Sequence, residues 1–356
     1  MTDFKYHYFL STPYFLYFLH YSYLQLIHGD LRAMGFITRA QQNDGNTSTP
    51  VTTTTNTHDH LRNDGFGAKT NVSAGDNVGK MPSFGQWIKS SLLDLVTMLC
   101  MGVVGLGVYF ASPAPTRSFP IFFQDGEIVY PQFAYPLRRN IIPIWAAALM
   151  ASLIPISLIL LTQIHNRSFW DANNAIMGLL YSLITAAVFQ VFLKWLIGGL
   201  RPHFLTVCKP RVPVTTLEET GKGLRNIMFD RRICMGNEKE INDSLESFPS
   251  GHSTAAFAGF VFLALYLNSK LKVWSNYHSA MWKMIVLWAP ILGATLIAAS
   301  LTIDEFHNWY DCVAGAIIGS IMAFSAYRMV YTSIWDYRTN HIPLSRESKS
   351  FGNGPN

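Results

Sequence analysis

Six long apolar runs restrict what this 356-residue chain can fold into. They lie at about 92–111, 141–161, 175–193, 251–267, 284–302 and 312–334, and the fourth is the least apolar. A helix needs roughly 20 apolar residues to cross the hydrocarbon core of a bilayer. The pattern therefore predicts an all-α bundle of six transmembrane helices, and so a multi-pass membrane protein.

The composition agrees with a membrane protein and excludes other classes. Charged residues make up 14% of the chain and hydrophobic residues 49%, whereas about a quarter of a typical soluble domain is charged. The formal net charge of +5 is too small to indicate a nucleic-acid partner, and no blocks of mixed aromatic and basic residues occur. We expect the basic residues to orient the chain in the membrane or to bind an anionic substrate.

The segments that flank the six spans differ in composition. Residues 1–39 are rich in aromatic residues and stay unassigned: they are either an interfacial segment or an upstream extension, with Met34 as the start. Residues 40–82 consist largely of Thr, Asn, Gly and Asp, which cannot bury apolar surface, so a disordered cytosolic tail is predicted. The catalytic domain is expected at 85–340, followed by a cytosolic tail at 341–356.

An even number of spans places both termini on one side of the membrane. We predict that this side is cytosolic, because the short loops and tails on it contain most of the basic residues that count in the positive-inside rule. The expected interfacial anchors are Trp87, Tyr109, Trp195, Tyr266, Trp282 and Trp309.

Three polar groups interrupt the apolar pattern, all where a span meets the non-cytosolic side. Lys194 and Arg201-Pro202 end the third span, where they are either anchors that extend to the interface or ligands for an anion. The second group, Pro249-Ser250-Gly251-His252, opens the fourth span, and free N–H groups at a helix start can bind phosphate. An ordinary Ser cap with an incidental His is the alternative reading.

The third polar group joins the last two spans and includes Ser300, His307 and Asp311. His307 and Asp311 are four residues apart, so on a helix the carboxylate of Asp311 can accept from one imidazole nitrogen of His307 and leave the other nitrogen free to attack. A structural His–Asp pair is the alternative. Two imidazoles, two cations and a helix start on one face suit phosphoryl transfer. Metal ligation by His252 and His307 is a lesser option, because zinc sites usually show paired ligands. No metal or cofactor is predicted.

In these residues the chain resembles the type 2 phosphatidic acid phosphatase superfamily, which includes lipid phosphate phosphatases and haloperoxidases. The family motifs are K-x6-R-P, P-S-G-H and S-R-x5-H-x3-D. The first two match in full at 194–202 and 249–252, and the third matches at Ser300, His307 and Asp311. The resemblance covers about 85–340 and implies a six-helix bundle of this type.

The resemblance also implies roles for individual residues. His307 would be the nucleophile that forms a phosphohistidine, Asp311 its orienting partner, and His252 the general acid. The groups expected to hold the phosphate are Lys194, Arg201, Ser250 and Gly251. The family works without a divalent metal on membrane phospholipids such as phosphatidate, lysophosphatidate and diacylglycerol pyrophosphate, at the non-cytosolic face.

One position departs from the family pattern: Leu301 replaces the Arg of the third motif. Loss of one such donor typically costs roughly 10²–10³ in rate. A basic residue of the 203–248 loop could substitute, or the substrate could differ in charge or shape, or the protein could bind lipid without turnover. The residues considered as substitutes are His203, Lys222 and Arg225.

The loop at 203–248 would face an oxidising compartment under this topology. A disulfide between Cys208 and Cys234 is therefore predicted, with two free thiols as the alternative. Asn242 is a candidate for glycosylation. The other sequons would be cytosolic and unmodified: Asn46, Asn71 and Asn166.

Two other functional classes compete with a lipid phosphatase. A catalytically impaired lipid-binding or scaffold protein is favoured by Leu301 alone. A channel or transporter is poorly supported, because Asp94 is the one carboxylate inside an apolar run away from the motifs. A membrane phospholipid is the expected partner, and a homo-oligomer stays open.

Overall fold

The computed structural model describes residues 83–111, 118–124, 127–128, 131–211 and 221–345. The chain divides into two compact units, 1–72 and 73–356, and every described residue belongs to the second. The expectations for 1–39 and 40–82, with Asn46 and Asn71, therefore lie outside the described residues, as does the tail from 346 onward.

Among the described residues, six helices are long and apolar enough to cross a membrane, which confirms the predicted spans and makes the protein a multi-pass membrane protein. The first begins at Phe84, earlier than expected, because Ser83 and Gln86 form a capping box around its start. The six are α2 (Phe84–Tyr109), α3 (Ile144–Asn166), α4 (Phe169–Leu196), α8 (Gly251–Leu271), α9 (Met281–Ile303) and α10 (Trp309–Val330).

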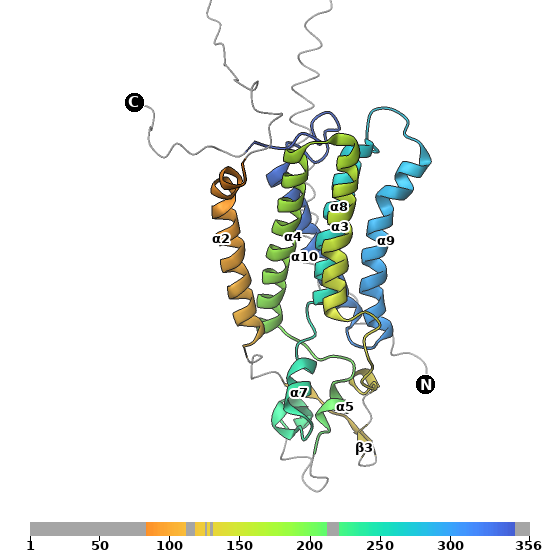
Figure 1. Ribbon diagram of the computed structural model, residues 1–356. Coiled ribbons are helices and arrows are strands. Elements are labelled where there is room, and N and C mark those ends of the chain that lie inside the picture. The colour runs from red at the N-terminus through yellow and green to blue at the C-terminus, as the bar shows by residue number, and fades with distance from the viewer. Residues whose placement is uncertain (1–82, 112–117, 125–126, 129–130, 212–220, 346–356) are drawn as a thin grey trace, which may run out of the picture. The chain divides into compact units, whose positions relative to one another are not determined.

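Short elements gather beyond one end of the long helices (Figure 1). We call this the loop end, where residues 197–250 join α4 to α8, and the opposite end the terminal end. Strand β1 pairs antiparallel with β4, and β2 with β3. The short elements are β1 (Phe119–Pro120), β2 (Phe123–Gln124), β3 (Glu127–Ile128), η1 (Pro131–Phe133), α5 (Phe204–Cys208), η3 (Leu224–Asn226), β4 (Met228–Phe229), η4 (Arg231–Ile233) and α7 (Glu238–Ser244).

Helix α8 forms the centre of the bundle and packs against α3, α4, α9 and α10. Most of its residues are buried, and it is the least hydropathic of the six spans. Glycines allow close approach: a Cβ on Gly259 would overlap the carbonyl oxygen of Ala151, and one on Gly319 would overlap that of Thr254. The fourth span looked weak in the sequence because α8 contacts other helices rather than lipid.

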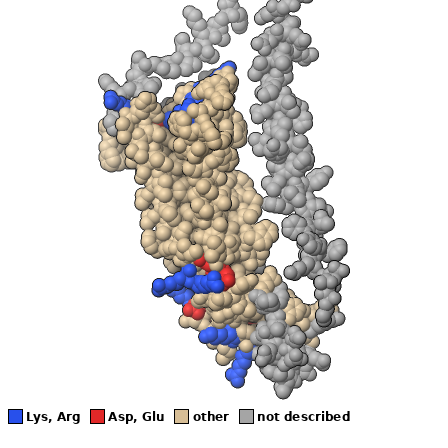
Figure 2. Space-filling model, turned by 90° about the vertical axis from the view of Figure 1, so that its right-hand side faces the viewer, with Lys and Arg blue, Asp and Glu red and all other residues tan. Residues whose placement is uncertain are grey.

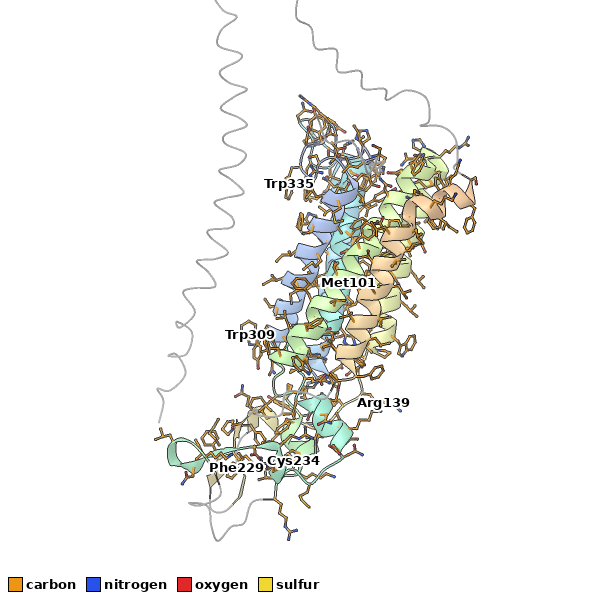
Figure 3. The ribbon with its side chains drawn as sticks, turned by 90° about the vertical axis from the view of Figure 1, so that its left-hand side faces the viewer. Met101, Arg139, Phe229, Cys234, Trp309 and Trp335 are labelled. Carbon is orange, nitrogen blue, oxygen red and sulfur yellow. A yellow bond between two sulfur atoms is a disulfide. The ribbon has the colours of Figure 1, made fainter. Side chains whose placement is uncertain are left out.

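On the face of the bundle shown in Figure 2, a broad belt without Lys, Arg, Asp or Glu side chains lies between the two ends. Apolar side chains of α2, α3 and α9 lie exposed in this belt, as expected for surfaces that contact lipid tails. Exposed tryptophans lie toward its two ends, for example Trp309 and Trp335 (Figure 3). The belt matches a bilayer core with aromatic residues at its interfaces.

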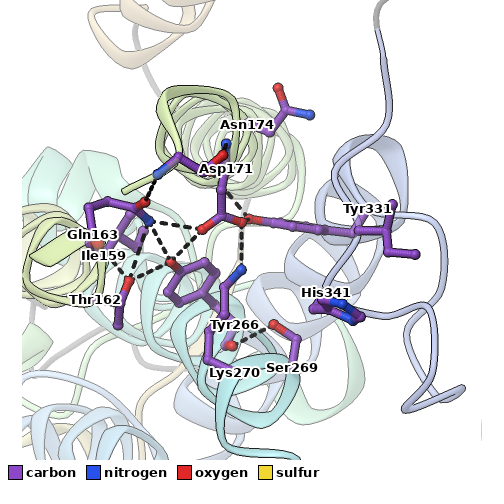
Figure 4. Close-up of polar contacts among 12 residues, drawn as sticks. Ile159, Thr162, Gln163, Asp171, Asn174, Tyr266, Ser269, Lys270, Tyr331 and His341 are labelled. Carbon is purple, nitrogen blue, oxygen red and sulfur yellow. Dashed lines mark hydrogen bonds and ion pairs between the residues drawn. The ribbon is translucent and has the colours of Figure 1, made fainter. Parts of the chain in front are cut away.

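A buried polar cluster at the terminal end joins side chains of α3, α4 and α8 to Tyr331, which directly follows α10 (Figure 4). Its centre is Asp171 in the first turn of α4, which is 3% exposed. One oxygen of Asp171 lies 2.6 Å from Lys270 Nζ and 2.9 Å from the Tyr331 hydroxyl. The other oxygen accepts from Gln163 and Tyr266. Tyr266 is thus fully buried in this cluster, and its expected role as an interfacial anchor is wrong.

Candidate active site

The three polar motifs meet at the loop end of the bundle. Gly198, in the first motif, accepts a backbone hydrogen bond from Phe248, at the edge of the second (3.3 Å). The amide of Ser250 in turn donates to the carbonyl oxygen of Asp311 in the third (3.1 Å). Backbone pairing therefore fixes all three segments against one another, and the predicted convergence is confirmed.

His307 and Asp311 lie together between α9 and α10. His307 is 4% exposed and Asp311 is fully buried in the first turn of α10. The imidazole Nδ1 is 3.5 Å from Asp311 Oδ2 and 3.4 Å from Ser247 Oγ, and this hydroxyl donates to the same carboxylate oxygen. Two oxygens therefore face Nδ1. A proton held there leaves Nε2 unprotonated and able to attack.

The surroundings of His307 favour its neutral form. Burial lowers the pKa of His307, Asp311 opposes this change, and the positive charges of Arg201 and Lys194 add to it, with a net value of about 3. The backbone amide of Asn308 also donates to Asp311 Oδ2, at 3.0 Å, which keeps this carboxylate in place. The imidazole is therefore a neutral base at physiological pH.

Arg201 lies buried beside this pair, in the loop that follows α4. Its guanidinium makes a two-pronged contact with the carboxylate of Asp243 on α7, at 2.8 and 3.0 Å. The flat face of the guanidinium lies over the ring of Phe306, with 3.9 Å from Cζ to the ring centroid. The backbone amide of Arg201 donates to Ser244, which ties this loop to α7. These contacts hold the guanidinium in one orientation.

Lys194 is the second cation of the site and lies in the last turn of α4. Its positive charge acts on both His307 and Glu246. Burial raises the pKa of Glu246, and Lys194 opposes this rise. The site therefore combines two cations with carboxylates contributed by the loop between α4 and α8.

The start of α8 adds a helix N-terminus to the site. Ser250 is the N-cap, and its Oγ accepts from the amide of Ser253 at 3.4 Å. Gly251 is the first residue of this helix and lies half-buried beside Gln190. Free N–H groups in a first helical turn suit an anion.

His252 follows in the first turn of α8 and is 4% exposed. Its Nε2 lies 2.9 Å from the carbonyl oxygen of Ile142, to which it donates a hydrogen bond. Sequence reasoning predicted the residue and not this partner, because Ile142 lies 110 positions away along the chain. The contact fixes the ring and leaves Nδ1 for any proton transfer.

The chain is similar in sequence to known proteins over most of its length. A PA-phosphatase related-family protein of Dictyostelium discoideum is 33% identical over 71% of this chain and 73% of that protein. The family model of the PAP2 superfamily matches residues 175–335, which include all three motifs. The chain belongs to the PAP2 superfamily.

Other PAP2 relatives have names that state an activity. Lipid phosphate phosphatase 1 of Arabidopsis thaliana is 32% identical over 67% of each chain. Diacylglycerol pyrophosphate phosphatase 1 of Saccharomyces cerevisiae is 28% identical over 70% of this chain and 82% of that protein. No solved structure matches the chain.

The departure from the PAP2 pattern lies inside the bundle. Leu301 is fully buried in a small apolar cluster with Ala298, Cys312 and Phe257. Its carbonyl oxygen accepts from the amide of His307 (3.3 Å), so the backbone at this position still shapes the turn that presents His307. The side chain contributes packing and no charge.

The three residues considered as substitutes for the missing Arg differ in position. His203 is at the site: its ring lies 5.2 Å from that of Phe306, and its Nδ1 is 3.1 Å from the carbonyl oxygen of Glu305. Burial lowers the pKa of His203, so it is a neutral side chain. Lys222 is 72% exposed and pairs with Asp230, so the structure does not bring it to the site. The side chain of Arg225 lies outside the described residues.

The predicted disulfide between Cys208 and Cys234 is present. It links the end of α5 to the segment before α7, and the amide of Met235 donates to Cys208. Asn242 lies half-buried on α7, and its glycosylation stays a prediction.

Ser247, Phe306 and Asp243 are site residues that sequence reasoning missed. Ser247 and Asp243 precede the second motif, and Phe306 lies at an unspecified position of the third. Their contacts with the site are made across the fold. Within the described part of the chain, no three His, Cys, Asp or Glu side chains are grouped to hold a metal ion. Asp94, considered for an ion path, accepts from the Tyr181 hydroxyl at 2.7 Å.

Proposed function

We propose that this protein is a membrane lipid phosphate phosphatase that acts on phosphatidate or related lipid phosphates, including lysophosphatidate and diacylglycerol pyrophosphate. One observation supports it above the others: His307 stands against Ser247 and Asp311, with Lys194 and Arg201 close enough to affect its charge. The names of the Arabidopsis and Saccharomyces relatives support the same class of substrate.

The proposed reaction has two steps. His307 Nε2 attacks phosphorus while the bond from phosphorus to the lipid oxygen breaks, and His252 protonates this oxygen. Water then attacks the phosphohistidine, gives its proton to His252 and releases inorganic phosphate. Protonated His252 keeps its Nε2–H on the carbonyl oxygen of Ile142 and offers the proton on Nδ1.

The groups proposed to hold the phosphate oxygens surround this histidine pair. They are Lys194, Arg201, Ser250 and the backbone of Gly251. Cations and helix N–H groups fixed before the reaction stabilise the charge that develops in the transition state. We propose that no divalent metal takes part, because these side chains already supply the positive charge.

We also propose that the site faces the lumen or the exterior and that the termini are cytosolic. The disulfide between Cys208 and Cys234 lies at the loop end with the site, which supports an oxidising compartment there. Protease protection of terminal tags in sealed vesicles tests this orientation, and sugar on Asn166, at the terminal end of α3, would overturn it.

The test of the function is phosphate release from phosphatidate in detergent with EDTA present. We expect turnover by the unmodified protein, a loss of about 10³-fold or more in His307→Ala, and no change in His165→Ala. His165 is an exposed histidine at the terminal end of α3 and serves as the matched control. Loss of activity with EDTA, or retained activity in His307→Ala, would contradict the mechanism.

A catalytically impaired lipid-binding protein is the second candidate, favoured by the apolar packing of Leu301. It predicts lipid binding with no phosphohistidine on rapid quench. Leu301→Arg separates the two: a rise in rate of about 10²-fold or more would show that the missing Arg limits turnover. If the unmodified protein forms phosphohistidine, the second candidate fails.

A further inference from the structure

Arg201 is held by a carboxylate in the way that an arginine holds a phosphate. Two guanidinium nitrogens face the two oxygens of Asp243, at 2.8 and 3.0 Å. Arginine binds carboxylates and phosphates with the same two-pronged geometry. Phe306 covers one face of the guanidinium. Asp243 lies at the end that carries Nη1 and Nη2, whereas the buried Nε makes no hydrogen bond within the described residues. The carboxylate therefore neutralises the charge that a phosphate would bind.

The two partners differ in how firmly they are placed. The side chain of Arg201 is 3% exposed, whereas that of Asp243 is 54% exposed and lies near the end of α7, a helix of seven residues. Asp243 can therefore turn into water without loss of buried packing. Arg201 keeps its ring contact and its backbone bond to Ser244 when this happens.

A second carboxylate of the same loop stands near the other cation. Burial raises the pKa of Glu246, and Lys194 is the positive charge that opposes this rise most strongly. A phosphate that approaches these cations brings two negative charges toward both carboxylates. Repulsion between like charges then favours departure of Asp243, which is the more exposed of the two.

We propose that Asp243 competes with the substrate phosphate for Arg201, and that phosphate binding displaces this carboxylate into solvent. The inference rests on the proposed function and adds a specificity-determining residue to it. Return of Asp243 to Arg201 weakens the binding of inorganic phosphate after hydrolysis. Asp243 therefore limits product inhibition and sets the affinity of the site for phosphate.

The test compares phosphate binding in charge-neutralised variants of the full chain. We expect Asp243→Asn and Asp243→Ala to bind inorganic phosphate about tenfold more tightly than the unmodified protein. Two readouts are used: inhibition of phosphatidate hydrolysis, and the shift of the thermal unfolding midpoint with added phosphate. The second needs no activity, and either variant suffices if the other fails to fold.

Glu240→Gln is the matched control, because Glu240 lies exposed on the same helix and its removal changes the net charge equally. Its phosphate affinity should be unchanged. If Asp243→Asn binds phosphate no more tightly than Glu240→Gln does, while Arg201→Ala still abolishes binding, the competition is disproved and the proposed function stands. If Arg201→Ala binds phosphate as the unmodified protein does and phosphatidate is not hydrolysed, the proposed function itself fails.

Discussion

At the scale of single residues, the chemistry of the site depends on the hydrogen atom at His307 Nδ1. Ser247 and Asp311 both place oxygens toward this atom. Burial lowers the pKa of His307 to about 3, so the neutral ring persists as the pH falls well below the usual range of histidine. In the unfolded chain His307 has its ordinary pKa, so below about pH 6.5 the unfolded state binds a proton that the folded state does not. The free energy of unfolding therefore decreases as the pH falls from about 6.5 toward 3.

The first prediction follows from that shift. In ¹⁵N-histidine NMR spectra of the protein in nanodiscs, the signal of His307 should show the neutral Nδ1–H tautomer from pH 8 down to about 5. Comparison with the spectrum of His307→Ala assigns this signal. A His307 signal that titrates near 6.5 would contradict the burial argument.

The second prediction concerns Ser247. Its hydroxyl donates to Asp311 and lies 3.4 Å from His307 Nδ1, so removing it loosens the orientation of the imidazole. Ser247→Ala should lower kcat about tenfold, because it removes a hydrogen bond to a charged group that orients the imidazole. KM should stay nearly unchanged, because this bond is not proposed to contact the substrate. Ser325→Ala, on the lipid-exposed part of α10, is the control. A change in KM alone would argue for a binding role.

The sequence predicted the motif residues of the site because spacing along the chain already places them on helix ends. Lys194 lies in the last turn of α4, and His307 and Asp311 are four residues apart, whereas Arg201 lies in the loop after α4 and not on the expected helix face. Ser247 and Asp243 could not be predicted in the same way. Their roles depend on how the loop at 203–248 folds against the bundle, and periodicity gives no information on loops.

At the scale of elements, the spans were predictable because the bilayer selects length and hydropathy. The short helices and strands at the loop end were not, since β1 pairs with β4 more than 100 residues later along the chain. The third motif shows the limit of pattern reasoning: Leu301 keeps the backbone geometry of the turn while its side chain joins the apolar packing between α8, α9 and α10.

The third prediction tests the glycine contacts of α8. Gly259→Val would force two branches against the carbonyl oxygen of Ala151, so α3 and α8 must separate. We expect a loss of roughly 1–3 kcal/mol or more in unfolding free energy, measured by thermal unfolding in detergent. Gly293→Val on α9 is the control, because a Cβ there meets no heavy atom within 4 Å. Equal losses in the two variants would show that helix propensity, not packing, sets the effect.

At the scale of the whole molecule, two buried polar centres lie at opposite ends of the same helices. The candidate active site joins the ends of α4 and α9 to the starts of α8 and α10. The cluster around Asp171 joins α3, α4 and α8 to Tyr331, which directly follows α10, at the terminal end. Burial raises the pKa of Tyr331, which keeps this phenol a hydrogen-bond donor to Asp171.

The fourth prediction concerns this cluster. Lys270→Met leaves Asp171 buried without its cation, and loss of one partner of a buried ion pair typically costs roughly 3–5 kcal/mol. The thermal unfolding midpoint in detergent should fall markedly, while Lys89→Met, on the exposed face of α2, should have little effect. The double variant Asp171→Leu, Lys270→Met should recover part of the loss. A single variant as stable as the control would show that the pair contributes little.

The central position of α8 has a consequence for how the protein enters the membrane during synthesis. Insertion favours segments by their own apolar content, and α8 is the least hydropathic span, with most of its length covered by other helices. Helices α3 and α4 are made before it and offer the surfaces that it packs against. We therefore expect α8 to insert poorly as an isolated segment and efficiently behind α3 and α4, so that biogenesis and tertiary packing are coupled at this helix.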